Sequence, residues 1–218
     1  MSDNTAALTI NTGAVYDMAT HNETIGNLQG DGTIVFDSTT LTLASGASTF
    51  GGELFGNGTI VINAGQSLTL TDSINASNIN IVLNGGTLNL GNGLTHAFGS
   101  LTVNGPGTSV IDFGTSGATI AEFSTVNVTG AGTLSVTNWT DYVDYFIATT
   151  SPGPQGTSPI NKVVFSGYVG NDTKWLPLIG GDGQLTPVPE PSTYGVIFLG
   201  GAAGLVWFRR HRRAQRRG

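Results

Sequence analysis

The sequence has no cysteine, few charged residues and almost no basic residues outside one terminal cluster. The lack of cysteine excludes disulfides, thiolate metal sites and cysteine-based catalysis. Charged residues make up 10% of the chain, against a usual share of about 25%. The first 208 residues contain two basic residues, Lys162 and Lys174, and 14 acidic ones. Such a surface repels phosphate, so we expect no nucleic-acid partner.

Motifs for catalysis and for metal binding are also missing. The three histidines lie far apart, and there is neither a His-x₃-His pair nor a Gly-x-Ser-x-Gly nucleophile turn. Four acids, Asp31, Asp37, Asp72 and Asp112, fall near expected turns and could align if repeats stack. We interpret them as solvated turn residues. The alternatives are a calcium site and the carboxylate pair of a polysaccharide lyase or hydrolase. We therefore expect no enzymatic activity, no metal and no cofactor.

What the chain has in abundance is glycine, with 33 residues, together with Thr, Val and Ile, which favour strands and tight turns. Residues 28–36 resemble residues 54–62, and Gly-Thr pairs begin at 32, 58, 86, 107 and 132. A unit of about 25 residues with two or three short strands is typical of one coil of a solenoid. The spacing therefore predicts an all-β fold, a parallel β-solenoid (β-helix), with an antiparallel β-sandwich as the alternative.

Stacking of such units predicts a continuous apolar column. The residues expected in it alternate with polar neighbours along each strand: Ile34, Phe36, Leu41, Leu43, Ile60, Ile62, Leu68, Leu70, Leu88, Leu90, Leu101 and Val103. Asn and Thr at the turns are expected to form ladders between coils. The repeats resemble the autotransporter-associated β-strand repeats of bacterial surface proteins, and this resemblance implies a surface role.

The repeat pattern changes near residue 139, which suggests four regions. We expect a β-strand repeat region at 1–138, a C-terminal cap at 139–179, a linker at 180–188 and a terminal tail at 189–218. The aromatic residues Trp139, Tyr142 and Tyr145 fall in the expected cap. Capping core is the preferred interpretation for them, and a carbohydrate-stacking surface is the alternative.

The tail combines a Pro-Glu-Pro signal, an apolar run and an arginine cluster. Residues 194–208 carry no charge and would rise about 22 Å as a helix, which is short for a bilayer core of about 30 Å. The apolar run predicts a transmembrane anchor that includes Tyr194, Gly195, Val196, Ile197, Phe198, Leu199, Leu205, Val206, Trp207 and Phe208. The cluster after it consists of Arg209, Arg210, Arg212, Arg213, Arg216 and Arg217. The positive-inside rule places this cluster in the cytoplasm and everything before the helix outside.

The order of these three pieces resembles the PEP-CTERM sorting tail of exported bacterial proteins. The resemblance implies that an exosortase recognises Val188, Pro189, Glu190 and Pro191 and processes the chain nearby. The helix at 194–208 would then tether the protein to the inner membrane transiently, with the arginines as a stop-transfer cluster, before release to the envelope, surface or matrix. Similar proteins begin with a signal peptide, and residues 1–20 do not read as one, so we expect a truncated start.

The function expected from the sequence is therefore an exported structural or adhesive protein of the cell surface or extracellular matrix. An exopolysaccharide or another matrix component is its candidate partner. The alternative is a carbohydrate-active enzyme or a glycan-binding module built on the β-solenoid.

Overall fold

The computed structural model describes residues 6–168, 172–178 and 181–188 of the 218-residue chain. These residues form β-strands and one short 3-10 helix, η1 (Ile160–Lys162), and they contain no α-helix. Buried and less buried side chains alternate along the strands, because apolar residues alternate with Thr, Asn and Ser. The all-β class predicted from the sequence is confirmed for this part of the chain.

The strands belong to two sheets. The eight-stranded sheet contains β1 (Leu8–Ile10), β4 (Leu28–Gly30), β6 (Ala47–Phe50), β8 (Ser67–Leu70), β11 (Thr87–Asn89), β13 (Thr108–Asp112), β15 (Thr133–Thr137) and β17 (Val163–Phe165), in that spatial order. The eleven-stranded sheet contains β2 (Val15–Asp17), β3 (Glu23–Ile25), β5 (Thr33–Leu43), β7 (Glu53–Asn63), β9 (Asn75–Ala76), β10 (Ile79–Asn84), β12 (Thr95–Val103), β14 (Ile120–Val128), β16 (Tyr145–Ala148), β18 (Thr173–Pro177) and β19 (Gly183–Pro187).

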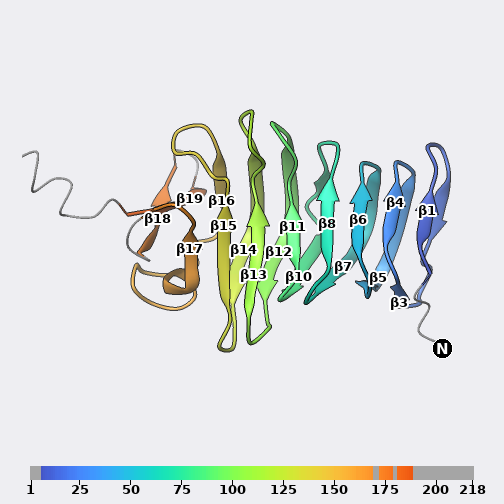
Figure 1. The fold of residues 1–218 in the computed structure, drawn as a ribbon, viewed down its shortest axis with the longest axis horizontal. Coiled ribbons are helices and arrows are strands. Elements are labelled where there is room, and N and C mark those ends of the chain that lie inside the picture. Colours follow the sequence, from blue (N-terminus) through green and yellow to red (C-terminus); the bar gives the residue numbers. More distant parts are fainter. Residues whose placement is uncertain (1–5, 169–171, 179–180, 189–218) are drawn as a thin grey trace, which may run out of the picture.

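The chain passes back and forth between the two sheets, and we call each passage through both sheets a circuit. Each strand pairs in parallel with the strand one circuit later, and among the paired strands of the described ranges only β16–β19 and β18–β19 are antiparallel. Figure 1 shows the circuits stacked along the long axis, from β1 at one end to β17, β18 and β19 at the other. This parallel pairing disagrees with the antiparallel sandwich that the sequence left open.

The early circuits are shorter than the repeat unit expected from the spacing of the Gly-Thr pairs. Thr69 lies opposite Asn89, which follows it by 20 positions in the chain. The two most similar segments of the sequence are not equivalent in the structure, since Leu28 lies in β4 of one sheet and Leu54 lies in β7 of the other. The similarity reflects a shared strand pattern of Gly, Thr and apolar residues, whereas backbone pairing sets the register.

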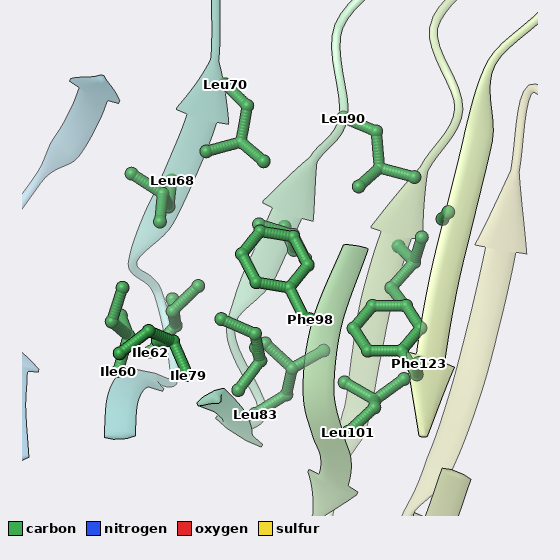
Figure 2. Close-up of a cluster of buried hydrophobic side chains, with 14 of the residues drawn as sticks. Ile60, Ile62, Leu68, Leu70, Ile79, Leu83, Leu90, Phe98, Leu101 and Phe123 are labelled. Carbon is green, nitrogen blue, oxygen red and sulfur yellow. The ribbon is translucent and has the colours of Figure 1, made fainter. Parts of the chain in front are cut away.

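The apolar interior runs the length of the stack. All twelve residues predicted for the column are buried, each with 2% or less of its surface exposed. Figure 2 shows part of this interior, where Ile60, Ile62 and Leu68 lie in one circuit and Leu83, Phe98 and Leu101 follow in the next ones. The prediction of the core is therefore confirmed. It could be made from the sequence because successive side chains of a strand point to opposite faces.

Polar ladders connect successive circuits, as the sequence predicted. The Nδ2 of Asn84 donates to the Oδ1 of Asn63 at 3.1 Å, and the Nδ2 of Asn89 donates to the Oγ1 of Thr69 at 3.0 Å. These bonds link residues one circuit apart, so they add side-chain contacts to the backbone pairing between coils.

The C-terminal end differs from the expected cap and linker. Parallel pairing continues beyond residue 138, because β16 pairs with β14 and β17 pairs with β15. The antiparallel hairpin of β18 and β19 then covers β16. Residues 183–187 therefore form a strand within the expected linker. Leu185 is fully buried there, opposite Phe146, and this burial explains why the segment joins the sheet.

Candidate functional site: a polar furrow and a terminal sorting motif

A furrow crosses the middle of the eleven-stranded sheet, where the regular strand alternation is interrupted. The register of β5 against β7 shifts between Asp37 and Thr39, and Ser38 adopts a φ of 58°. In a later circuit the strand is interrupted at Ser77 and Asn78, between β9 and β10, whereas β12 and β14 continue without a break. The furrow has a volume of about 440 Å³ and is lined by Ser38, Asn57, Gly58, Thr59, Ser77, Asn78, Asn80, Gly99 and Ser124.

Two glycines keep neighbouring circuits close along the furrow. A Cβ on Gly99 would lie 2.6 Å from the Oδ1 of Asn80, and one on Gly58 would lie 2.4 Å from the ring of Phe36. Both distances are shorter than van der Waals contact, so a larger residue would push the circuits apart. Glycine at these positions therefore preserves the shape of the furrow.

The furrow contains one side chain with a structural role and several that have no protein partner. Asn80 donates to the carbonyl of Gly58 and accepts hydrogen bonds from the backbone N–H and the hydroxyl of Ser100, the latter two at 2.8 Å. In the described part of the chain, the remaining polar lining side chains form no hydrogen bond: Ser38, Asn57, Thr59, Ser77, Asn78 and Ser124. Their amide and hydroxyl groups can therefore bind a ligand or water.

Among the described residues, those that line the furrow include no charged side chain. One aromatic residue lies close to it in the sequence: Phe55, two residues before Asn57 in β7, is 54% exposed. Phe55 is not one of the lining residues, but an exposed aromatic ring on the same strand as Asn57 could serve a ligand that has both apolar faces and hydroxyls. The site can bind neutral polar molecules, and its described lining offers no positively charged side chain that would pair with an anion.

The four aspartates expected near turns do not form one cluster in the structure. Asp31 and Asp72 approach the same glycine, since a Cβ on Gly51 would lie 2.7 Å from the Oδ1 of Asp31 and 3.6 Å from the Cβ of Asp72. Asp72 accepts the backbone N–H of Ser73, which is a turn contact. Across the described ranges, no group of three or more His, Asp or Glu side chains could hold a metal ion.

The other two acids lie elsewhere in the stack. Asp112 ends β13, where its Oδ1 accepts hydrogen bonds from the backbone N–H of Gly114 and the Nδ2 of Asn138, both at 2.8 Å. Asp37 is exposed and lies on β5 next to the bulge at Ser38. The structure therefore brings Asp31 and Asp72 near one another and leaves Asp37 and Asp112 apart from them.

One buried histidine belongs to the interior. His96 is fully buried; its Nδ1 accepts the backbone N–H of Ile74, and its Nε2 donates to the carbonyl of Leu90 at 2.7 Å. Burial lowers the pKa of His96, while the bond to Leu90 and the charge of Asp72 oppose that shift. The ring stacks on Phe98. This arrangement stabilises a neutral imidazole within the core.

The aromatic residues near 139 separate into core and surface. Trp139 is 5% exposed and packs edge-on against Phe165, with ring centroids 4.8 Å apart. Tyr142 is 88% exposed, and Tyr145 is half-buried in β16. Trp139 is part of the core, as interpreted, whereas the exposed Tyr142 does not fit that interpretation. A stacking surface that includes the ring of Trp139 is wrong because Phe165 and Tyr168 pack against it.

The predicted sorting signal begins where the described strands end. The backbone N–H of Val188 donates to the carbonyl of Asp172 at 2.8 Å, directly after β19. Pro189, Glu190, Pro191, the helix expected at 194–208 and the arginine cluster lie outside the described residues. Within residues 6–168, 172–178 and 181–188, no helix is long and apolar enough to cross a membrane.

Residues 187–213 match the family model of the PEP-CTERM protein-sorting motif. The chain carries this motif. The matched range begins at the last residue of β19, includes Val188 to Pro191 and extends into the arginine cluster. A PEP-CTERM motif indicates that an exosortase sorts the protein for export to the envelope or the cell exterior. No curated protein and no solved structure matches the chain.

The furrow was not predicted from the sequence. Its signals were present as interruptions of the strand pattern, at Asp37-Ser38, at Gly56-Asn57-Gly58 and at Ser77-Asn78. Each interruption reads as an ordinary turn when it is taken alone. They become one site only because the pairing register places them at the same level of successive circuits.

Proposed function

We propose that the described strands form a parallel β-solenoid and that this rod has an exported structural or adhesive role, not a catalytic one. The observation that supports it best is the parallel stack from β1 to β17, which is followed by the hairpin of β18 and β19 and then by a sorting motif. Each circuit would be one coil, and each coil contacts only its neighbours, as in other repeat proteins.

The stack has the properties expected of a rod. Its interior is a single continuous apolar cluster, and polar ladders join successive circuits on the outside. The hairpin of β18 and β19 covers one end of the eleven-stranded sheet. We propose that many weak polar contacts along such a rod hold it to a glycan or another matrix component, with affinity from multivalency. The likeness to autotransporter-associated repeats is part of this proposal.

Sorting would proceed through the terminal motif. In this proposal the exosortase recognises Val188, Pro189, Glu190 and Pro191 and processes the chain nearby. The helix at 194–208 tethers the protein to the inner membrane until then, with residues 209–217 in the cytoplasm and the rod outside. The last described strand ends at Pro187, and the signal begins at the next residue, Val188, whose backbone N–H donates to the carbonyl of Asp172. The folded strands therefore lead directly into the signal.

Cell fractionation tests the sorting part of the proposal. A tagged full chain is compared with a variant carrying Pro189→Ala, Glu190→Ala and Pro191→Ala. A control variant carries Ser151→Ala and Gln155→Ala in an exposed loop. We expect the signal variant to remain in the inner-membrane fraction, while the wild type and the control reach the envelope or the surface. Equal delivery of all three proteins would contradict the proposal.

The non-catalytic role has its own test. The purified full chain is incubated with a panel of polysaccharides, and newly formed reducing or unsaturated ends are measured over time. We expect no release above the blank. Turnover that increases with protein concentration would show that the rod is an enzyme.

A further inference from the structure

The furrow runs along the stack and is lined by polar residues from several of its strands. Its polar residues come from β5 (Ser38), β7 (Asn57), the break between β9 and β10 (Ser77, Asn78) and β14 (Ser124). Adjacent strands in a sheet lie about 4.8 Å apart. From β5 to β10 the furrow therefore offers amide or hydroxyl groups at a spacing close to the length of one extended pyranose unit. The interval is wider at β12, where the lining residue is Gly99.

The hydrogen-bonding state of these residues distinguishes the furrow from the ladders outside it. Asn63 and Asn84 bond to each other across circuits, and Asn80 is held by Gly58 and Ser100. By contrast, within the part of the chain that the structure describes, the side chains of Asn57 and Asn78 have no protein partner. An asparagine amide supplies two donors and an acceptor, which matches a ligand whose hydroxyls both donate and accept.

The charge of the furrow narrows the class of ligand. Lys or Arg would strengthen the binding of an anionic polymer through charge-assisted hydrogen bonds, and the described lining contains neither. The exposed ring of Phe55 lies two residues from Asn57 and can stack on the apolar face of a sugar. The lining therefore favours a ligand that is neutral and rich in hydroxyl groups.

We propose that the furrow binds a neutral, linear polysaccharide whose chain lies along the long axis of the stack. This inference rests on the proposed surface or matrix role and names the site and the ligand class for it. One polymer chain contacts several circuits at once, so binding strengthens with polymer length until the furrow is filled.

Affinity electrophoresis of the full chain tests the inference. Native gels contain a neutral linear polymer (hydroxyethyl cellulose, pullulan or glucomannan) or an anionic one (alginate or polygalacturonate). The protein is kept in a detergent without a sugar headgroup, because a glycosidic headgroup would compete. The main variant carries Asn57→Ala and Asn78→Ala, and the control carries Asn161→Ala, an exposed asparagine in η1. Phe55→Ala and the bulky Ser77→Trp are two further variants, and circular dichroism checks that each variant is folded.

We expect at least one neutral polymer to retard the wild type and the control equally. Loss of two amide contacts should weaken retardation about tenfold or more in the double variant, and Phe55→Ala and Ser77→Trp should weaken it as well. The inference is overturned if none of the neutral polymers retards the protein, if the anionic polymers retard it as strongly, or if all the furrow variants bind like the wild type. Delivery of the same variants to the surface is measured separately by fractionation. Failure of polysaccharide binding would therefore overturn the furrow inference without deciding the sorting proposal.

Discussion

The first and second halves of the stack share one strand pattern but differ in circuit length and interior. In the eight-stranded sheet, Thr69 lies opposite Asn89, 20 positions later in the chain, whereas Thr108 lies opposite Thr133, 25 positions later. The contacts between aromatic rings in the described ranges all involve residues from His96 onward. The second half thus has longer circuits and an interior joined by rings.

The extra residues enter the connections and leave the pairing intact. Two residues join β6 to β7, whereas seven join β13 to β14. Figure 1 shows the connections of the later circuits extending farther from the sheets. Strands stay in register because each backbone group requires a partner in the next circuit, whereas turns on the surface tolerate insertions. The comparison shows that backbone pairing, and not a constant repeat length, defines this fold.

The largest expected effect is the loss of an aromatic ring from the second half. Phe123 is fully buried between Phe98 and Phe146, with ring centroids 5.8 and 5.9 Å away. We expect Phe123→Ala to lower the free energy of unfolding by about 3–5 kcal/mol, measured by urea denaturation of the full chain with circular dichroism. The exposed neighbour Ser124 is the control, and its change to alanine should stay within about 0.5 kcal/mol.

The loss of unfolding free energy in Phe123→Ala is to be compared with that in Leu68→Ala. Leu68 is buried in the first half, where no ring contacts occur among the described residues. A larger loss for Leu68→Ala than for Phe123→Ala would contradict the view that the ring contacts stabilise the second half.

The second prediction concerns the tight turns of the short circuits. A Cβ on Gly52 would lie 1.8 Å from the carbonyl oxygen of Gly32, whereas one on Gly107 would meet nothing within 4 Å. We expect Gly52→Ala to lower the free energy of unfolding by about 1–3 kcal/mol, because the backbone must move apart. Gly107→Ala should be close to neutral. Similar losses at both positions would show that the close approach of Gly52 to Gly32 does not restrict a side chain there.

The third prediction concerns a ladder in the first half. The Nδ2 of Asn84 donates to the Oδ1 of Asn63, and both residues are half-buried. We expect Asn84→Ala to cost about 0.5–1.5 kcal/mol, the net value of one hydrogen bond. Asn127, an exposed asparagine of β14, is the matched control. An equal cost at both positions would show that the ladder adds nothing to the backbone pairing.

The last prediction concerns the titration of His96. Its influence on the free energy of unfolding is smallest at neutral pH and should grow as the solution becomes acidic. Because burial lowers its pKa in the folded protein, the unfolded chain takes up a proton more readily below about pH 6.5. Stability is then complete above about pH 6.5 and is lost as the pH falls toward the lowered pKa. We expect His96→Gln to flatten this dependence in urea titrations at several pH values, and His21→Gln, at an exposed position, to leave it unchanged. An unaltered slope in His96→Gln would assign the acid sensitivity to another group.

The interior was largely predictable because it depends on local pattern. Residues such as Ile34, Leu41 and Leu88 alternate with polar neighbours, and a strand places every second side chain on the same face. The strand partners and the register of their pairing were not predictable. Leu28 and Leu54 stand in similar sequences yet belong to different sheets, because short Gly-Thr strands are alike wherever they pair.

The candidate site was predictable only in its terminal part. The motif at 187–213 is contiguous, so its residues could be recognised in order. The furrow combines residues from Ser38 to Ser124, and its unpartnered amides become evident only once the partners of the other asparagines are known. The sequence favoured a core role for Trp139 and placed Leu185 in a linker, but their burial depends on Phe165 and on the hairpin that covers β16.

By itself, the sequence determined the strand-rich class, the inward-facing residues and the sorting motif, because each of these depends on residues adjacent in the chain. Tertiary structure alone decided the length of the circuits, the closing hairpin and the furrow. These features arise from backbone pairing and burial between segments that lie a whole circuit apart in the chain, and short alternating strands are compatible with several registers until their hydrogen bonds select one.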